Sequence, residues 1–115
     1  MVEKRALKRS VLHQNCKVFD IQTNKLIGHA IDMTVHGLKI NSFNDYTPGQ
    51  RLELRIELPE EIPGKRSIRF SGLVRWSLPD ENPNLALTGI QIYSISPEDG
   101  EAIIALMAQY SFSLS

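Results

Sequence analysis

Two short clusters of polar residues have the chemistry to bind an anionic, aromatic ligand. Arg5 and Arg9 stand four residues apart near the N-terminus, directly after Lys4. A guanidinium group can hold a phosphate with two parallel hydrogen bonds, donate to the O6/N7 edge of guanine, or stack on a base. Four residues span about 6 Å along a helix and up to about 13 Å when extended. Both side chains can therefore reach one ligand, although a solvated basic tail has the same pattern.

The second cluster runs from Asp32 to Gly37 and combines an acceptor, a hydroxyl and a glycine. The Asp32 carboxylate can accept hydrogen bonds from the N1–H and N2–H₂ groups of guanine, and the Thr34 hydroxyl can donate or accept. Gly37 permits a positive φ or the close approach of the backbone to a ligand. An ordinary Asx-type turn, in which both side chains bond to nearby backbone groups, is the alternative interpretation.

Composition limits the partners that we expect. The 115 residues fit one domain, and the hydrophobic fraction of 42% is enough for a packed core. The 13 basic and 13 acidic residues give a net charge of zero, whereas a surface that binds DNA or RNA duplexes carries an excess of Lys and Arg. The basic residues near the N-terminus therefore predict a local anionic partner and no long polyanion.

Cysteine and histidine usage predicts a reducing compartment and no metal site. Cys16 is the only cysteine, so an internal disulfide is impossible, and with His13, His29 and His36 it gives no known zinc spacing. The N-terminus shows charges without a following apolar signal region. No apolar run approaches the roughly 20 residues that span a bilayer. These features predict a cytoplasmic protein that does not insert into a membrane.

Period-2 alternation of apolar and polar residues predicts strands along most of the chain. The clearest strand covers residues 51–58, in which every second residue is Leu or Ile and the others are charged. Turns containing polar residues, Pro or Gly separate the strands. The other predicted strands are Val11–Phe19, Leu26–Met33, Leu38–Ile40, Ser67–Trp76 and Leu85–Tyr93.

The same alternation predicts which side chains are buried. Trp76 shares its parity with Phe70 and Val74, which predicts a core or rim aromatic and not a stacking platform for a base. Gly72 permits a bulge within this strand. Cys16 shares the parity of apolar neighbours, which predicts a buried and unreactive thiol.

One helix is expected after the last strand. Ser96 is a good N-cap, Pro97 suits the first helical position, and acidic residues follow in the first turn. An apolar stripe at helical spacing comprises Ile103, Leu106, Met107 and Tyr110. Six short strands and one helix predict an all-β fold, a closed or nearly closed antiparallel barrel capped by the C-terminal helix, because closure removes exposed strand edges.

The two polar clusters together resemble the signature of the PilZ domain family. Arg5 and Arg9 precede the first strand, and Asp32, Thr34 and Gly37 follow the second, in the order Arg-x-x-x-Arg and [Asp/Asn]-x-Ser-x-x-Gly. The resemblance covers nearly the whole chain. Later matching segments are the alternating fourth strand, Leu73-Val74-Arg75-Trp76, Leu87-Thr88-Gly89-Ile90-Gln91-Ile92 and Ser96-Pro97-Glu98-Asp99.

The resemblance implies a six-stranded PilZ-type barrel over residues 11–115, preceded by a flexible arm over residues 1–10. It implies that cyclic di-GMP binds the outer surface, that Arg5 and Arg9 hold its phosphates and guanine edges, and that Asp32 and Thr34 read the other side of a guanine. Gly37 would allow close approach, and Lys4 would add charge or remain solvated. Thr34 departs from the usual Ser: it keeps the hydroxyl but adds a methyl group that stiffens χ1.

The residues and the resemblance leave several functions open. The first is a cyclic di-GMP receptor or adaptor without cofactors, monomeric or weakly dimeric, that relays the signal to an unidentified downstream protein. The alternative is a degenerate PilZ module that binds a protein and no nucleotide. A single-stranded nucleic-acid binder needs a basic groove with several aromatics, which zero net charge and 7% aromatic residues disfavour. The sequence shows no Ser/His/Asp, Cys/His or metal constellation that would predict an enzyme.

Overall fold

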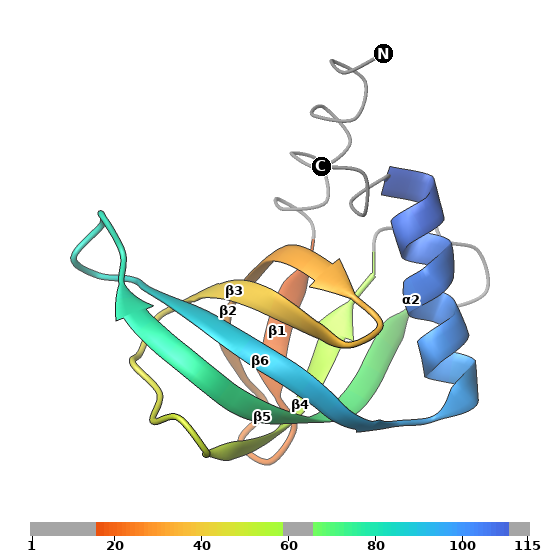
Figure 1. Cartoon of the computed structure of the whole chain (residues 1–115), viewed down its shortest axis with the longest axis horizontal. Coiled ribbons are helices and arrows are strands. Elements are labelled where there is room, and N and C mark those ends of the chain that lie inside the picture. Colours follow the sequence, from red (N-terminus) through yellow and green to blue (C-terminus); the bar gives the residue numbers. More distant parts are fainter. Residues whose placement is uncertain (1–15, 59–65, 111–115) are drawn as a thin grey trace.

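The computed structural model describes residues 16–58 and 66–110, with side chains described as far as residue 107. Six strands precede one helix (Figure 1). The elements are β1 (Lys17–Asp20), β2 (Lys25–Thr34), β3 (Gly37–Ser42), β4 (Arg51–Glu57), β5 (Ser67–Pro79), β6 (Ala86–Ile95) and α2 (Pro97–Tyr110).

The strands form a closed antiparallel barrel in the order β1-β2-β3-β6-β5-β4. Pairing of β1 with β4 completes the ring, so neither strand leaves a free edge. The predicted six-stranded antiparallel barrel with a C-terminal helix is therefore confirmed. The predicted first strand begins at residue 11, and its residues 11–15 lie outside the described part of the chain.

The barrel interior is filled by the apolar half of the alternating pattern. In β4, Leu52, Leu54 and Ile56 are buried while the charged residues between them lie outside. Cys16 is fully buried in the same core, as its parity predicted. Burial raises the pKa of its thiol to about 12, so the reactive thiolate is disfavoured near neutral pH.

The helix α2 is fixed to the barrel through its first turn. The Ser96 hydroxyl accepts a hydrogen bond from the Asp99 amide at 3.1 Å, which confirms the predicted N-cap. The Asp99 carboxylate in turn accepts one from the Arg69 amide of β5 at 3.1 Å. Ile103 and Leu106 are fully buried against the barrel. Figure 1 shows α2 at one end of the barrel, away from the hairpin that joins β5 and β6.

In β5, one bulge interrupts the alternation of inward and outward side chains. In β5, Val74 lies opposite Ile90 and Trp76 opposite Gly89, so Arg75 is one extra residue. The prediction that Trp76 shares a face with Val74 is wrong, because the extra residue Arg75 exchanges the inner and outer positions beyond it. A further register shift lies between Ser71 and Gly72, but its extra residue is Tyr93 of β6, so β5 itself has no bulge at Gly72.

Candidate functional site

The strand register gathers the second polar cluster and residues of distant strands on one outer wall of the barrel. Two rows of outward positions cross β2, β3, β6 and β5. The first row contains Asp32, Lys39, Gly89 and Trp76, each opposite the next. The second row contains Thr34, Gly37, Gln91 and Leu73. Neighbouring strands lie about 4.8 Å apart, so each row spans a distance suited to a small-molecule ligand.

Both ends of the first row face outward because of a bulge. In β2, Ala30 lies opposite Ile40 and Asp32 opposite Lys39, so Ile31 is an extra residue. Ala30 is buried, and unbroken alternation would turn Asp32 inward with it. The bulge at Arg75 likewise turns Trp76 outward. Bulges commonly re-aim a side chain beside a binding site.

These residues line an open depression of about 350 Å³. Its lining includes Asp32, Thr34, Lys39, Arg75 and Trp76. This volume is at the lower end of the range for ligand pockets, roughly 300–1,000 Å³. The depression thus brings together an indole, two cationic groups, a carboxylate and a hydroxyl.

The Trp76 ring lies close against the wall because its neighbour across the strands is a glycine. A Cβ atom placed on Gly89 would meet the Trp76 ring, 2.6 Å from Cζ2. The indole is half-buried and lines the depression. Fixed by the wall on one side, it is a flat surface on which an aromatic base can stack.

The cationic groups of the depression come from β3 and from the bulge in β5. Arg75 is exposed and donates a hydrogen bond from Nη1 to Gln91 Oε1 at 3.2 Å. Lys39 is exposed and makes no ion pair within residues 16–58 and 66–110. Both side chains are long enough to meet a phosphate group in front of the wall.

Asp32 and Thr34 also make the local backbone contacts that the turn interpretation predicted. Asp32 Oδ1 accepts a hydrogen bond from the Met33 amide at 2.9 Å, and Thr34 Oγ1 accepts one from the His36 amide at 3.1 Å. A carboxylate has about four acceptor positions, and a hydroxyl can still donate. These contacts hold both groups in place on the outer wall.

Gly37 has a structural reason to be glycine. A Cβ atom there would lie 2.5 Å from the carbonyl oxygen of Ile90 in β6. Gly49 is the glycine with a positive φ in the described chain, and Gly37 is not. The close pairing of β3 with β6 thus requires Gly37, and its approach to a ligand stays a prediction.

The predicted arm residues Lys4, Arg5 and Arg9 lie outside the described part of the chain. The described chain begins at Cys16, whose carbonyl oxygen accepts a hydrogen bond from the Ala30 amide at 3.0 Å. The chain therefore enters the barrel beside β2, two residues from Asp32.

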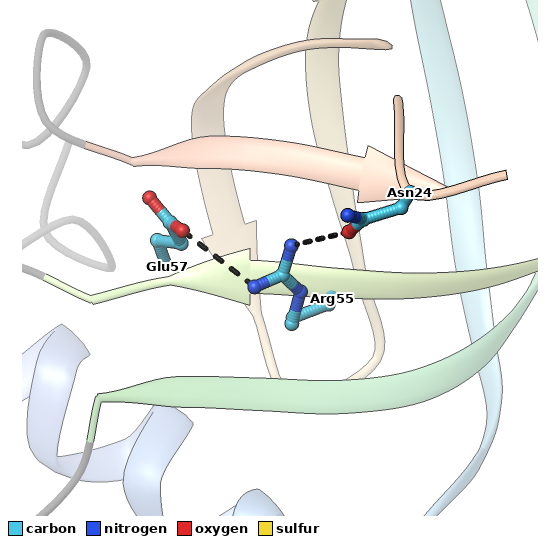
Figure 2. Close-up of polar contacts among 3 residues, drawn as sticks. All are labelled: Asn24, Arg55 and Glu57. Carbon is cyan, nitrogen blue, oxygen red and sulfur yellow. Dashed lines mark hydrogen bonds and ion pairs between the residues drawn. The ribbon is translucent and has the colours of Figure 1, made fainter. Parts of the chain in front are cut away.

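The far wall of the barrel, formed by β1 and β4, has polar residues that bond to one another. Arg55 lies between Asn24 and Glu57 (Figure 2), 3.2 Å from Asn24 Oδ1 and 3.6 Å from Glu57 Oε2. Its guanidinium carbon also lies 4.4 Å from the centre of the Phe19 ring. This wall has both a cation and an aromatic ring, but they are already in contact with each other.

The described residues form neither a metal-binding cluster nor a membrane-spanning helix. Within residues 16–58 and 66–110, no three His, Cys, Asp or Glu side chains lie close enough to hold a metal ion. The helix in this part of the chain is too short and too polar to cross a membrane.

Six antiparallel strands closed into a barrel, with a helix docked at one end, define a PilZ-type fold. The chain belongs to the PilZ family: the model described as "PilZ domain" matches residues 3–109. No curated protein sequence matches it significantly.

Two solved structures share the fold. The *Bacillus subtilis* inhibitor of motility, MotI/DgrA, has a TM-score of 0.61 and 19% identity over 86% of this chain. The chain spans 46% of the length of MotI/DgrA, about half of that protein. The PilZ domain of *Escherichia coli* YcgR, solved with c-di-GMP, has a TM-score of 0.56 and 10% identity, and the match covers 86% of this chain and 80% of that domain.

Among the residues that line the depression, sequence reasoning missed Lys39, Arg75, Trp76 and Gln91. One signal for Trp76 was present: Gly89 interrupts an apolar strand, and such a glycine often marks a bulge or a close approach. Trp76 meets Gly89 only because of the pairing register of β5 with β6, and the sequence alone does not reveal this register.

Proposed function

We propose that this chain is a cytoplasmic cyclic di-GMP receptor, which acts by binding and not by catalysis, and which relays ligand occupancy to a protein partner. The single observation that carries the proposal is the meeting of Asp32, Thr34, Lys39, Arg75 and Trp76 in one open depression. Membership of the PilZ family and the c-di-GMP in the YcgR domain structure support this choice of ligand.

The chemistry of the depression suits a ligand with two guanines and two phosphates. The Trp76 indole stacks on one guanine, for which alanine substitutions typically give about 1–3 kcal/mol per base. The Asp32 carboxylate accepts from guanine N1–H and N2–H₂, donors that an adenine does not offer at these positions. Arg75 and Lys39 lie where they can meet phosphate oxygens.

An arm over residues 1–10, ahead of a barrel domain over residues 11–115, completes the proposed site. Arg9 is seven residues from Cys16, which reaches up to about 24 Å when extended. Because Cys16 bonds to Ala30 beside the depression, Arg5 and Arg9 can close over the same ligand. Ordering of the arm on binding would change the surface that a partner meets.

A PilZ module that binds only protein is the competing function. Thr34 in place of the family's Ser is the feature that would favour it, since the added methyl group can crowd the ligand. The Thr34 hydroxyl is held on the outer wall by its bond to the His36 amide, and it remains able to donate. The depression thus keeps the chemical groups that the nucleotide requires.

Calorimetric titration of the full chain tests the proposal, with cyclic di-GMP and cyclic di-AMP as matched ligands. They share the phosphate–ribose ring and differ in the bases. We expect saturable heat with cyclic di-GMP, affinity for cyclic di-AMP lower by at least about tenfold, and loss of this preference in Asp32→Asn, because a mismatched base edge costs about 1–3 kcal/mol. Equal affinities for the two dinucleotides would refute recognition of guanine by Asp32. No heat with either ligand would favour the module that binds only protein.

A further inference from the structure

The outer wall continues past the depression toward the hairpin that joins β5 and β6. The next row along these strands contains Asn41, Leu87 and Leu78, each opposite the next. It lies two residues along each strand from the row that contains Trp76. In Figure 1 this hairpin projects from the barrel at the end opposite to α2.

The usual amphipathic pattern is inverted at this end of the barrel. Three neighbouring strands each point a hydroxyl inward and a large apolar side chain outward at consecutive positions. The pairs are Ser42 and Phe43, Ser77 and Leu78, and Thr88 and Leu87. Antiparallel barrels normally place the apolar residue inside and the polar residue in water, so this inversion indicates an apolar surface made for contact.

The inner hydroxyls form their own network, which leaves the apolar residues outside. The Ser42 and Thr88 hydroxyls are 2.9 Å apart, and those of Ser77 and Thr88 are 3.0 Å apart. Ser42 and Thr88 are completely buried. A satisfied buried network is costly to break, so the strands cannot turn over to bury their apolar side.

Two of these apolar side chains are exposed, and Leu87 is half-buried. Leu78 is 55% exposed and Phe43 is 45% exposed. Leu87 of β6 lies directly opposite Leu78 of β5. Phe43, directly after β3, is the diagonal neighbour of Leu87. The Phe43 ring also meets His29 edge-on, with ring centres 6.5 Å apart, which places it on the outer face.

The two segments that carry these side chains have charges of a single sign. Residues 40–50 and 77–88 include Asp45, Asp80 and Glu81 and contain no Lys or Arg. The Tyr46 amide donates to Ser77 Oγ at 3.3 Å, so the loop with Asp45 lies beside β5. The neighbouring depression instead has the cations Lys39 and Arg75. We call Phe43, Leu78, Leu87, Asp45, Asp80 and Glu81 the hairpin surface.

We propose that the hairpin surface is the docking site for a protein partner whose contact segment combines apolar side chains with Lys or Arg. The inference deepens the proposed function, on which it rests, by assigning the chemistry of the partner that receives the signal. Apolar side chains would cover Phe43, Leu78 and Leu87, and the cations would meet the acidic rim. A partner seated there would border a ligand stacked on Trp76.

A second copy of the chain does not fit this surface by two-fold pairing. An isologous contact places the same patch against itself, and here it would bring three acidic residues toward three others with no cation between them. Like charges placed together oppose association. The acidic rim therefore favours a basic partner over self-association.

The test uses two short amphipathic helical peptides, one of Leu and Lys and one of Leu and Glu, added to isotope-labelled protein observed by NMR. We expect the Leu/Lys peptide to shift amide signals of residues 43–46 and 77–87. The substitution L78S should lower its affinity by at least about tenfold, the loss of one buried anchor side chain. The double substitution D80K/E81K should transfer binding to the Leu/Glu peptide.

Controls separate this inference from the proposed function. Ile104 of α2 is 57% exposed, so I104S removes an equally exposed apolar side chain elsewhere and should leave peptide affinity unchanged. L78S should bind cyclic di-GMP as the natural chain does. No binding of the Leu/Lys peptide, equal losses in L78S and I104S, or a dimer that L78S dissolves would each overturn the docking site, whatever the nucleotide titration gives.

Discussion

The two outer walls of the barrel have similar residue types but arrange them differently. On the β1–β4 wall, Arg55 contacts Asn24, Glu57 and the Phe19 ring. On the wall of β2, β3, β6 and β5, an aromatic ring and cationic groups line an open depression of about 350 Å³. Both walls display an aromatic ring beside a cation, but only on the second do these groups line an open depression.

The difference traces to strand register. The β4 strand pairs with β1 and β5 without a register shift, so its outer side chains lie at regular cross-strand distances and satisfy one another. The β2 and β5 strands each contain an extra residue, which turns Asp32 and Trp76 outward. Local breaks in the alternation can thus give two walls of similar residue types a different arrangement.

The comparison is tested most sharply by removing one arginine from the proposed arm and one from the β1–β4 wall. We expect Arg9→Ala to abolish detectable binding of cyclic di-GMP with little loss of stability, because its guanidinium is proposed to hold the ligand and not the barrel. Arg55→Ala is the matched control and should bind normally. Calorimetry and thermal unfolding of both variants measure this. Unfolding of the Arg9 variant would mean that the arm is structural.

Removal of the aromatic ring from each wall should have the next largest effect. Trp76→Ala should weaken cyclic di-GMP by about 10- to 100-fold, the equivalent of roughly 1–3 kcal/mol of base stacking. Phe19→Ala, on the other wall, should leave the affinity unchanged. Equal affinities for the Trp76 variant and the natural chain would show that the indole does not touch the ligand.

A smaller effect is expected from displacing the indole without removing it. Gly89→Ala introduces a Cβ that meets the Trp76 ring, so the ring must tilt away from the wall. We expect affinity to fall by less than in Trp76→Ala, by about threefold to tenfold, less than one full stacking contact. The double variant should be no weaker than Trp76→Ala alone, and an additive loss would argue against action through the ring.

The smallest expected effect is on the free energy of unfolding, through Arg55 of the β1–β4 wall. The contact of Arg55 with Glu57 is partly exposed to solvent, and exposed ion pairs typically contribute about 0–1 kcal/mol. We expect Arg55→Ala to lower the free energy of unfolding by no more than about 1 kcal/mol, measured by urea titration. A much larger loss would show that this cluster holds the barrel closed.

Regular alternation made much of the fold predictable. The strand with Leu52, Leu54 and Ile56, the Ser96 cap and the burial of Cys16 follow from local sequence, and the structure confirms them. The six-stranded PilZ barrel was predicted from motif order over the whole chain. Such features depend on residues that are close in sequence or on a pattern spread along it.

The site was predictable only where the family motif named it. Parity with Ala30 alone would have buried Asp32, and parity with Val74 did lead to the wrong placement of Trp76. A bulge is fixed by pairing with a strand that is distant in sequence, so counting residues within one strand does not reveal it. The contributions of Lys39 and Arg75 likewise required the register of the assembled wall.

The central claim is that cyclic di-GMP stacks on the outer wall at Trp76. Trp76 is the only tryptophan in the chain, so its fluorescence reports on this wall alone. Titration with cyclic di-GMP should change the emission saturably, with the same midpoint as calorimetry, and cyclic di-AMP should act only at higher concentration. Saturable heat without any change in the Trp76 emission would place the ligand elsewhere and contradict the account.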